Sequence, residues 1–185
     1  MNEAVADHRP ATVRDVMIPL SEHPHVPYWL TIRQAMVVLR EIALEQERGR
    51  YYEPTLLVFD QEYNLLGVVR RRHLLAAVEP RLTDPTAFDV KGVPGERACL
   101  HGSGETTAHC LAEATGYRAG YNLQVSEVMT PIRAVAGPED CIVKAFHTMV
   151  RVDVAMLPVM DGDQVLGVVR WTDLFNEILG GLLEQ

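Results

Sequence analysis

The sequence predicts an α+β fold, close to α/β, built from two copies of one small unit of strands and helices. Two observations predict it: short blocks of sequence recur in the same order, and the hydrophobic pattern between the blocks is also repeated. The 185 residues suffice for one domain of ordinary size or for two small ones that share a core. With 48% hydrophobic and 23% charged residues, the composition is that of a globular protein.

Two pairs of segments carry the repeat. Val13–Pro19 (VRDVMIP) is echoed by Val125–Pro131 (VSEVMTP), and Leu66–Arg70 (LGVVR) recurs letter for letter as Leu166–Arg170. The blocks keep their order along the chain. The first copy is therefore the longer one, with extra residues between its two blocks.

An amphipathic helix follows the first block in each copy. In the second copy it begins after the turn Gly137–Asp140, and in the first copy Thr31 is the predicted N-cap. The first helix is expected to continue through Arg48 and to end at Gly49, which accounts for most of the extra residues. The apolar positions at helical spacing are Ile32, Ala35, Met36, Leu39, Ile42 and Ala43 in the first copy, and Ile142, Ala145, Phe146 and Met149 in the second.

Each helix is followed by two short apolar runs and a polar turn, a pattern typical of a β-hairpin. A second helix comes next in both copies. The predicted strands are Thr55–Phe59, Leu65–Val69, Ala155–Met160 and Val165–Val169, and the predicted helices are His73–Val78 and Thr172–Leu183.

The predicted organisation is a first repeat with its N-terminal segment at residues 1–79, an insertion at 80–122 and a second repeat at 123–185. A repeat of about 60 residues buries little surface on its own. We therefore expect the two sheets to pair.

This order of motifs resembles the CBS-domain pair, or Bateman module. The resemblance covers Thr12–Glu79 and Gln124–Leu183. It is strongest in the second copy, where Val128–Pro131, Leu157–Asp161 and Gly167–Leu174 fall in family order and spacing. It implies tandem CBS repeats with pseudo-twofold symmetry, in which small three-stranded sheets are flanked by helices.

The resemblance also implies a function. CBS pairs are regulatory sensors, and the cleft between the repeats can bind an adenosine-containing ligand such as AMP, ADP, ATP or S-adenosylmethionine. No cofactor is required, and such modules often form homodimers. The expected role is thus a non-enzymatic regulatory module that acts on a separate, unidentified protein.

One acidic residue is the main ligand-binding candidate. In the family, an aspartate at the start of the last helix accepts hydrogen bonds from the ribose hydroxyls, and Asp173, next to Thr172, matches it. A carboxylate can accept two hydroxyl donors, and the helix N-terminus presents N–H groups to an anion. His73 occupies the equivalent position in the first copy, which puts a second ribose site in doubt.

Arginine ends the second hairpin strand in both copies, where the family has threonine or serine. Arg170, helped by Arg70 or Arg72, is expected to bind phosphate through paired N–H donors. The alternative is that Asp173 only caps its helix, while the arginines are solvated or pair with surface carboxylates.

By family analogy, the backbone of Met156, Leu157 and Pro158 flanks the adenine. Core packing is the favoured interpretation for the Leu157 side chain, and Pro158 is expected to shape the strand start. Leu57 stands at the equivalent position in the first copy.

The insertion offers weaker candidates. Its Cys and His residues fit no common zinc pattern, and 101–107 lacks the lysine of a P-loop, so we predict no metal site and a helix cap near Thr106. The metal-ligand types here are Cys99, His101, His109 and Cys110. The segment His23–Pro27 is expected to be a turn.

Composition excludes several classes. The net charge of −8 argues against broad nucleic-acid binding. No apolar run is long enough to span a bilayer, and Met1–Pro10 lacks the apolar core of a signal peptide. Three cysteines suit a reducing compartment, so we expect a cytoplasmic protein.

Two alternatives remain open. The chain could be a degenerate CBS pair that serves as a constitutive dimerisation or docking platform, which the loss of the aspartate at His73 favours. An enzyme built on the insertion is the least favoured, because no nucleophile–base set is found there.

Overall fold

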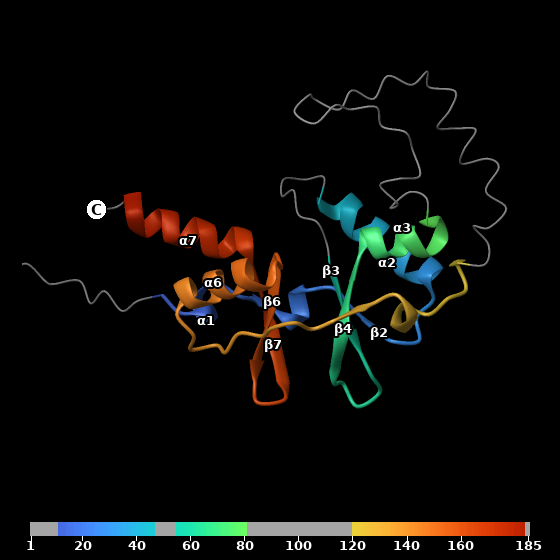
Figure 1. Cartoon of the computed structure of the whole chain (residues 1–185), viewed down its shortest axis with the longest axis horizontal. Helices are drawn as coiled ribbons and strands as arrows, with labels where there is room; N and C mark the ends of the chain where they lie inside the picture. Colours follow the sequence, from blue (N-terminus) through green and yellow to red (C-terminus); the bar gives the residue numbers. More distant parts are fainter. Residues whose placement is uncertain (1–10, 47–54, 81–119, 184–185) are drawn as a thin grey trace, which may run out of the picture. The chain divides into compact units, whose positions relative to one another are not determined.

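The computed structural model describes residues 11–46, 55–80 and 120–183, which form two compact units (Figure 1). Unit 1 contains residues 11–24, 62–65 and 131–183. Unit 2 contains the described parts of 25–61 and 66–130. Each unit has its own sheet and its own apolar core.

Unit 1 has a three-stranded antiparallel sheet in the order β1-β7-β6, with α6 and α7 packed against each other. The two short apolar runs of the second repeat form the β6–β7 hairpin, in which Leu157 pairs with Val169. Its elements are α1 (Val13–Val16), β1 (Ile18–Pro19), the 3-10 helix η1 (Leu20–Glu22), α6 (Ile142–Val152), β6 (Met156–Asp161), β7 (Gln164–Arg170) and α7 (Trp171–Leu183).

Unit 2 has a four-stranded sheet in the order β2-β3-β4-β5, and α2 contacts α3. Its elements are β2 (His25–Pro27), α2 (Ile32–Gln46), β3 (Thr55–Phe59), β4 (Leu65–Arg70), α3 (Arg71–Val78), the 3-10 helix η3 (Val125–Glu127) and β5 (Thr130–Pro131). The helix and strand bounds agree with the sequence prediction to within about two residues, the usual uncertainty of such ends. The predicted end of α2 at Gly49 lies outside the described residues.

The strand β2 was not predicted, and the prediction of a turn at His23–Pro27 is wrong for its last three residues. β2 pairs in parallel with β3, with Val26 opposite Val58. Backbone pairing with a strand some 30 residues away forms this element. A three-residue segment is too short to show strand periodicity.

Each repeat has a short lead-in segment before its first long helix, Val13–Pro19 in the first repeat and Val125–Pro131 in the second. Each lead-in segment pairs with the hairpin of the other repeat. β1, near the start of the first repeat, pairs with β7 of the second, and Pro19 lies opposite Gly167. β5, near the start of the second repeat, borders β4 of the first. Each unit is thus assembled from both repeats, and the packing units differ from the sequence repeats in these segments.

Two equivalent glycines permit this exchange. A Cβ added at Gly67 would lie 2.6 Å from the Thr130 carbonyl oxygen, and one added at Gly167 would meet the Ile18 carbonyl oxygen. A side chain at either position would therefore separate the lead-in strand from its hairpin. Both glycines thus face the carbonyl oxygen of the equivalent residue of a lead-in segment, so the repeated sequence blocks form repeated structure.

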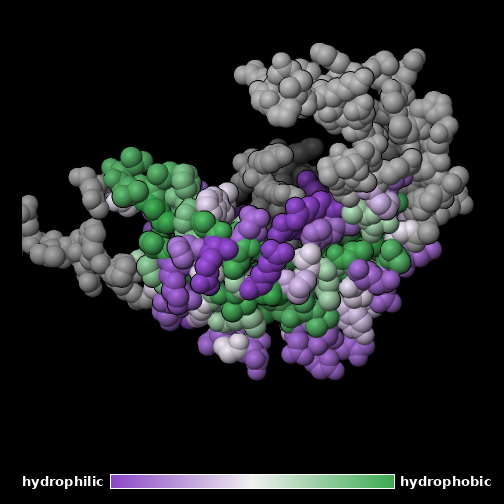
Figure 2. All heavy atoms as spheres, viewed as in Figure 1, coloured by the Kyte–Doolittle hydropathy of each residue, from purple (hydrophilic) through white to green (hydrophobic). Residues whose placement is uncertain are grey.

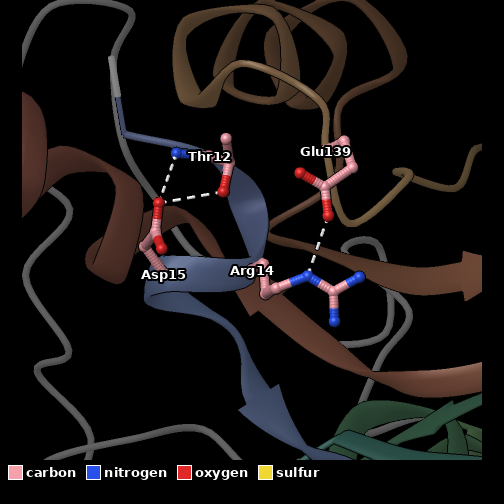
Figure 3. Close-up of polar contacts among 4 residues, drawn as sticks. All are labelled: Thr12, Arg14, Asp15 and Glu139. Atoms are coloured by element: carbon pink, nitrogen blue, oxygen red, sulfur yellow. Dashed lines mark hydrogen bonds and ion pairs between the residues drawn. The ribbon is translucent and has the colours of Figure 1, made fainter. Parts of the chain in front are cut away.

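Short polar contacts fix the lead-in of unit 1 (Figure 3). The Thr12 backbone N–H and hydroxyl both donate to Asp15 Oδ2, at 2.8 and 2.9 Å, which caps α1. Arg14 Nε donates to Glu139 Oε1 at 2.9 Å. The Val13 N–H donates to the Asp140 carbonyl, so α1 is tied to the turn before α6.

The predicted cap of α2 is confirmed. Thr31 Oγ1 accepts a hydrogen bond from the Gln34 N–H, and the Gln34 side chain accepts one from the Thr31 N–H. This reciprocal arrangement is a capping box, which satisfies two backbone donors at the helix start.

Among the described residues, no helix is long and apolar enough to cross a membrane.

Candidate functional site

The two leading site candidates of the second repeat contact each other at the junction of β7 and α7. Arg170 is the last residue of β7, and Asp173 lies in the first turn of α7. Arg170 Nε donates to Asp173 Oδ2 at 2.6 Å, and Arg170 Nη2 donates to Asp173 Oδ1 at 2.5 Å. This two-point geometry is the strongest form of arginine–carboxylate pairing.

The pair is largely shielded from water, since the two side chains are 19% and 20% exposed. Its attraction is therefore screened less than that of a surface ion pair. Asp173 also lies in the first turn of α7, near the positive end of the helix dipole. The backbone that supports the pair is well defined: the Trp171 N–H donates to the Ala155 carbonyl, and Arg170 lies opposite Met156 in the β6–β7 hairpin.

The predicted adenine-flanking residues lie on β6, beside this pair. Met156 is half-buried, whereas Leu157 and Pro158 are buried. The Leu157 side chain belongs to the core of unit 1, which agrees with its interpretation as a packing residue. Only the Met156 side chain, opposite Arg170, keeps partial access to solvent among these three.

A short segment alongside β6 was not anticipated from the sequence. The Ala136 N–H donates to the Pro158 carbonyl, and the Ala136 carbonyl accepts from the Met160 N–H, both at 2.9 Å. The segment therefore lies beside β6 as a parallel bridge. No periodicity or motif marks it, because the contact is made by backbone atoms of one residue.

The equivalent junction in unit 2 has different chemistry. The Arg70 N–H donates to His73 Nδ1 at 3.3 Å, so the imidazole caps α3 as an acceptor. Burial, together with the nearby charges of Arg72 and Arg70, lowers the pKa of His73 below its ordinary value. His73 is therefore a neutral acceptor, where Asp173 is a charged one.

The remaining predicted residues divide between the units. Thr172 is exposed at the second position of α7 in unit 1. Arg70 and Arg72 belong to unit 2, and Arg72 Nε lies 3.5 Å from His73 Nε2. The structure thus brings together Arg170, Asp173 and β6, and it places Arg70 and Arg72 at the matching junction of the other unit.

The ion pair could have been read from the sequence. Arg170 and Asp173 are three residues apart at the start of a helix, and such residues are neighbours on its surface. The same spacing holds for Arg70 and His73.

The pair can offer both kinds of contact that a nucleotide needs. Each Asp173 oxygen accepts one bond from Arg170, and a carboxylate oxygen has a second lone pair for a hydroxyl donor. A guanidinium has five N–H donors, of which this pairing uses two. The arginine therefore orients the carboxylate and places a positive charge beside it.

The predicted absence of a metal site concerned the cysteines and histidines of the insertion. Cys99, His101, His109 and Cys110 lie outside the described residues, as do 101–107 and the predicted helix cap near Thr106. Within the ranges that the structure describes, no group of three or more His, Cys, Asp or Glu side chains could hold a metal ion.

Comparison with protein families gives one match. Residues 125–180 match the family model described as the CBS domain. No curated protein sequence matches the chain.

Several solved structures share the fold. A CBS-domain protein of unknown function from Bacillus anthracis str. Ames Ancestor has a TM-score of 0.61 at 16% identity, with 92% of this chain and 94% of that one covered. CBSX2 in complex with AMP has a TM-score of 0.58 at 20% identity, with 91% and 96% covered. The cytosolic domain of the Mg²⁺ channel MgtE in complex with ATP has a TM-score of 0.55 at 17% identity, with 88% and 46% covered.

Proposed function

We propose that the chain, whose residues 125–180 match the CBS domain and whose mixed α+β fold is that of a tandem CBS pair, is a regulatory module that binds an adenine nucleotide or a related adenosyl ligand. The ligand binds at the β7–α7 junction of unit 1. Asp173 accepts hydrogen bonds from the ribose hydroxyls, and Arg170 contacts the phosphate. Thr172 and the strand residues Met156, Leu157 and Pro158 border this site.

The observation that carries the proposal is the shielded, two-point Arg170–Asp173 pair. An ion pair of this kind is expensive to remove from water. Because stability alone does not favour such a pair over an apolar contact, a ligand that needs both charges is the better explanation. The preformed geometry also lowers the entropy cost of binding, because neither side chain must be ordered by the ligand.

Two proteins of the same fold support the choice of ligand class. CBSX2 was solved with AMP and the MgtE cytosolic domain with ATP. Both ligands combine an adenosine with phosphate. A ribose acceptor beside an arginine is the chemistry that these two parts require.

The wider role follows from the fold and stays a proposal. Binding regulates a separate protein by favouring one conformation or assembly of the module, which requires different affinities for the two states. Assistance from Arg70 or Arg72, the repeat boundaries at 79 and 123, a homodimer and a cytoplasmic location are predictions of the sequence that extend this proposal.

The proposal is tested by thermal unfolding and calorimetry of the full chain with AMP, ADP, ATP and S-adenosylmethionine. At 100 times its Kd, a bound ligand adds about 2.7 kcal/mol to the free energy of unfolding. We expect at least one of the four to bind the unaltered protein. Asp173→Ala should abolish binding, and Asp173→Asn should weaken it, since an amide keeps one acceptor oxygen.

His73→Ala is the matched control, because His73 holds the equivalent position in unit 2. It should leave binding unchanged. If none of the four ligands binds, or if Asp173→Ala binds as well as the unaltered chain, the proposal is wrong. A constitutive platform then becomes the better description, and the mutual pairing of Arg170 and Asp173 would be its structural explanation.

A further inference from the structure

α2 and α3 of unit 2 border a pocket of about 270 Å³, and its lining is almost wholly apolar. The lining residues are Met36, Leu39, Arg40, Arg71, Leu74 and Leu75. The repeat alignment matches them with Phe146, Met149, Val150, Trp171, Leu174 and Phe175 of unit 1. The same position on the fold can therefore be compared in the two repeats.

In unit 1 this position is filled by the chain itself. The rings of Phe146 and Trp171 lie 4.1 Å apart, centroid to centroid, between α6 and α7. Methionine and arginine replace these two aromatic residues in unit 2, at Met36 and Arg71. The pocket thus corresponds to the position that an aromatic pair fills in the other repeat, so the fold itself does not require a pocket here.

The surface at this position also differs between the units. Figure 2 shows a hydrophobic face over α7 of unit 1, where Trp171 is 37% exposed, and Val150 of α6 is 56% exposed. Unit 2 has arginine at both equivalent positions, Arg71 and Arg40. Unit 2 therefore combines an apolar pocket with two positive charges, where unit 1 has apolar side chains.

The two arginines place their charges at the edge of the pocket. Both are exposed, and because the lining is almost wholly apolar, they contribute mainly methylene groups to it. Among the residues that the structure describes, neither Arg40 nor Arg71 has a side-chain hydrogen bond or ion pair. The chain as a whole has a net charge of −8, so this positive charge is a local feature that can select an anion.

These features together define the class of ligand. A small-molecule site is usually an apolar pocket with a few polar groups that fix the orientation of the ligand. Arginine pairs well with a carboxylate, since its planar group of N–H donors matches the two oxygens. The pocket has the volume of about nine molecules of liquid water, so the apolar part of the ligand is a short chain or a single ring.

We propose that the α2–α3 pocket of unit 2 binds an amphipathic monocarboxylate, an organic acid with a short apolar tail. The tail packs on the apolar lining, and Arg40 and Arg71 bind the carboxylate at the edge. This site is distinct from the one proposed for the nucleotide, because Arg170 and Asp173 belong to unit 1. It does not depend on nucleotide binding.

The test measures binding of octanoate to the full chain by calorimetry and by the shift of its thermal unfolding midpoint, without nucleotide. Acetate has the carboxylate without the tail, and 1-octanol has the tail without the charge. Acetate should bind more weakly than octanoate by about a hundredfold or more, because it lacks the methylene groups that the pocket would bury. 1-Octanol should bind about tenfold more weakly, because it cannot form charged hydrogen bonds with the arginines.

The arginine variants separate the charge from the pocket. Arg40→Gln and Arg71→Gln should each weaken octanoate binding about fivefold and leave 1-octanol binding nearly unchanged, because each removes a charge at the edge. Arg151→Gln is the matched control. Arg151 is an exposed arginine on α6, the helix of unit 1 that corresponds to α2, and its variant should bind octanoate as the unaltered chain does.

A double variant tests the pocket itself. Met36→Phe combined with Arg71→Trp gives unit 2 the aromatic pair of unit 1, and it should abolish binding of both octanoate and 1-octanol by filling the pocket. Circular dichroism checks that this variant folds. If it does not fold, the two single arginine variants still decide the proposal.

Three outcomes would overturn the proposal. Octanoate could give neither heat nor a shift of the midpoint, it could bind no better than acetate, or both arginine variants could bind it as well as the unaltered chain. Light scattering of the same samples then shows whether a second copy of the chain covers the pocket instead. Nucleotide binding by the Arg40→Gln variant is measured separately, so the two proposals can fail independently.

Discussion

The two helix junctions of this protein show how one backbone supports two chemistries. At β7–α7, Arg170 and Asp173 form a charged pair with two short hydrogen bonds. At β4–α3, Arg70 meets a neutral His73 through one longer bond. The repeats share the strand, the arginine and the helix start. The acceptor differs because His73 stands where the second repeat has Asp173, which gives unit 1 a carboxylate acceptor at a position where unit 2 has an imidazole.

The same contrast extends to the helix faces. Unit 1 has aromatic residues where unit 2 has arginine and methionine. Both differences lie on or next to exposed positions, whereas the cores of the two units remain apolar. These two differences thus lie at or beside the surface, where packing constrains the residue type less than it does in the interior.

The largest expected effect concerns the glycine that each unit has next to its lead-in segment. Gly167→Ala and Gly67→Ala should each lower the free energy of unfolding by about 3 kcal/mol, because the added Cβ meets a lead-in carbonyl. The measurement is urea unfolding followed by circular dichroism. Gly180→Ala in α7 is the control, since nothing lies within 4 Å of its added Cβ. It should be neutral or stabilising. A small effect at only one of the two lead-in glycines would show that the exchange of lead-ins is not equivalent in the two units.

A second experiment compares the free energy of unfolding when the acceptor side chain of each junction is removed. Asp173→Ala should cost about 2 kcal/mol, because it leaves a largely buried arginine without its carboxylate. His73→Ala should cost less than about 1 kcal/mol, since the two contacts that it removes, from the Arg70 N–H and from Arg72 Nε, are long, at 3.3 and 3.5 Å. Equal costs in urea unfolding would contradict the difference between the two junctions.

The reverse substitution sharpens the comparison. His73→Asp places a carboxylate three residues after Arg70, the spacing of the pair in unit 1, and it should raise the free energy of unfolding by about 1 kcal/mol. The readout is the unfolding midpoint at pH 7, compared with that of His73→Asn, which has a similar shape without the charge. A variant no more stable than His73→Asn would show that Arg70 cannot adopt the geometry of Arg170.

A smaller effect depends on pH. Since burial lowers the pKa of His73 in the folded chain below 6.5, the unfolded chain binds the proton more readily. The neutral His73 of the folded chain therefore contributes to the free energy of unfolding. This contribution is fully present above pH 6.5 and is lost as the pH falls through the lower pKa of the folded chain. Unfolding midpoints measured from pH 7.5 to 5 should show that the loss is absent in His73→Asp. The same loss in both proteins would assign it to other groups.

The smallest effect concerns a surface pair. Arg14 and Glu139 are 49% and 64% exposed, so their contact is screened by water and salt (Figure 3). Glu139→Ala should change the free energy of unfolding by no more than about 0.5 kcal/mol, measured in the same urea series. A cost near that of Asp173→Ala would mean that the exposed Arg14–Glu139 pair stabilises the fold as much as the shielded Arg170–Asp173 pair.

Much of the fold could be predicted from the sequence. Periodicity identified α2, α6 and both hairpins, because each buries one apolar face along a continuous segment. The candidate site residues could also be chosen from the sequence, since Asp173 follows a recurring motif and Arg170 ends a recurring strand. The pairing of these two residues could have been inferred from their spacing, but it was not.

The sequence by itself determined the repeat, the secondary structure and the residue types at each junction, because these depend on local pattern and on self-similarity. Only the tertiary structure decided that β1 joins β7 and that β5 borders β4, because backbone pairing between distant segments leaves no periodic signal in side chains. It also decided that α2 and α3 leave a pocket. That feature depends on the volume between the helices, which is fixed only when the whole chain packs.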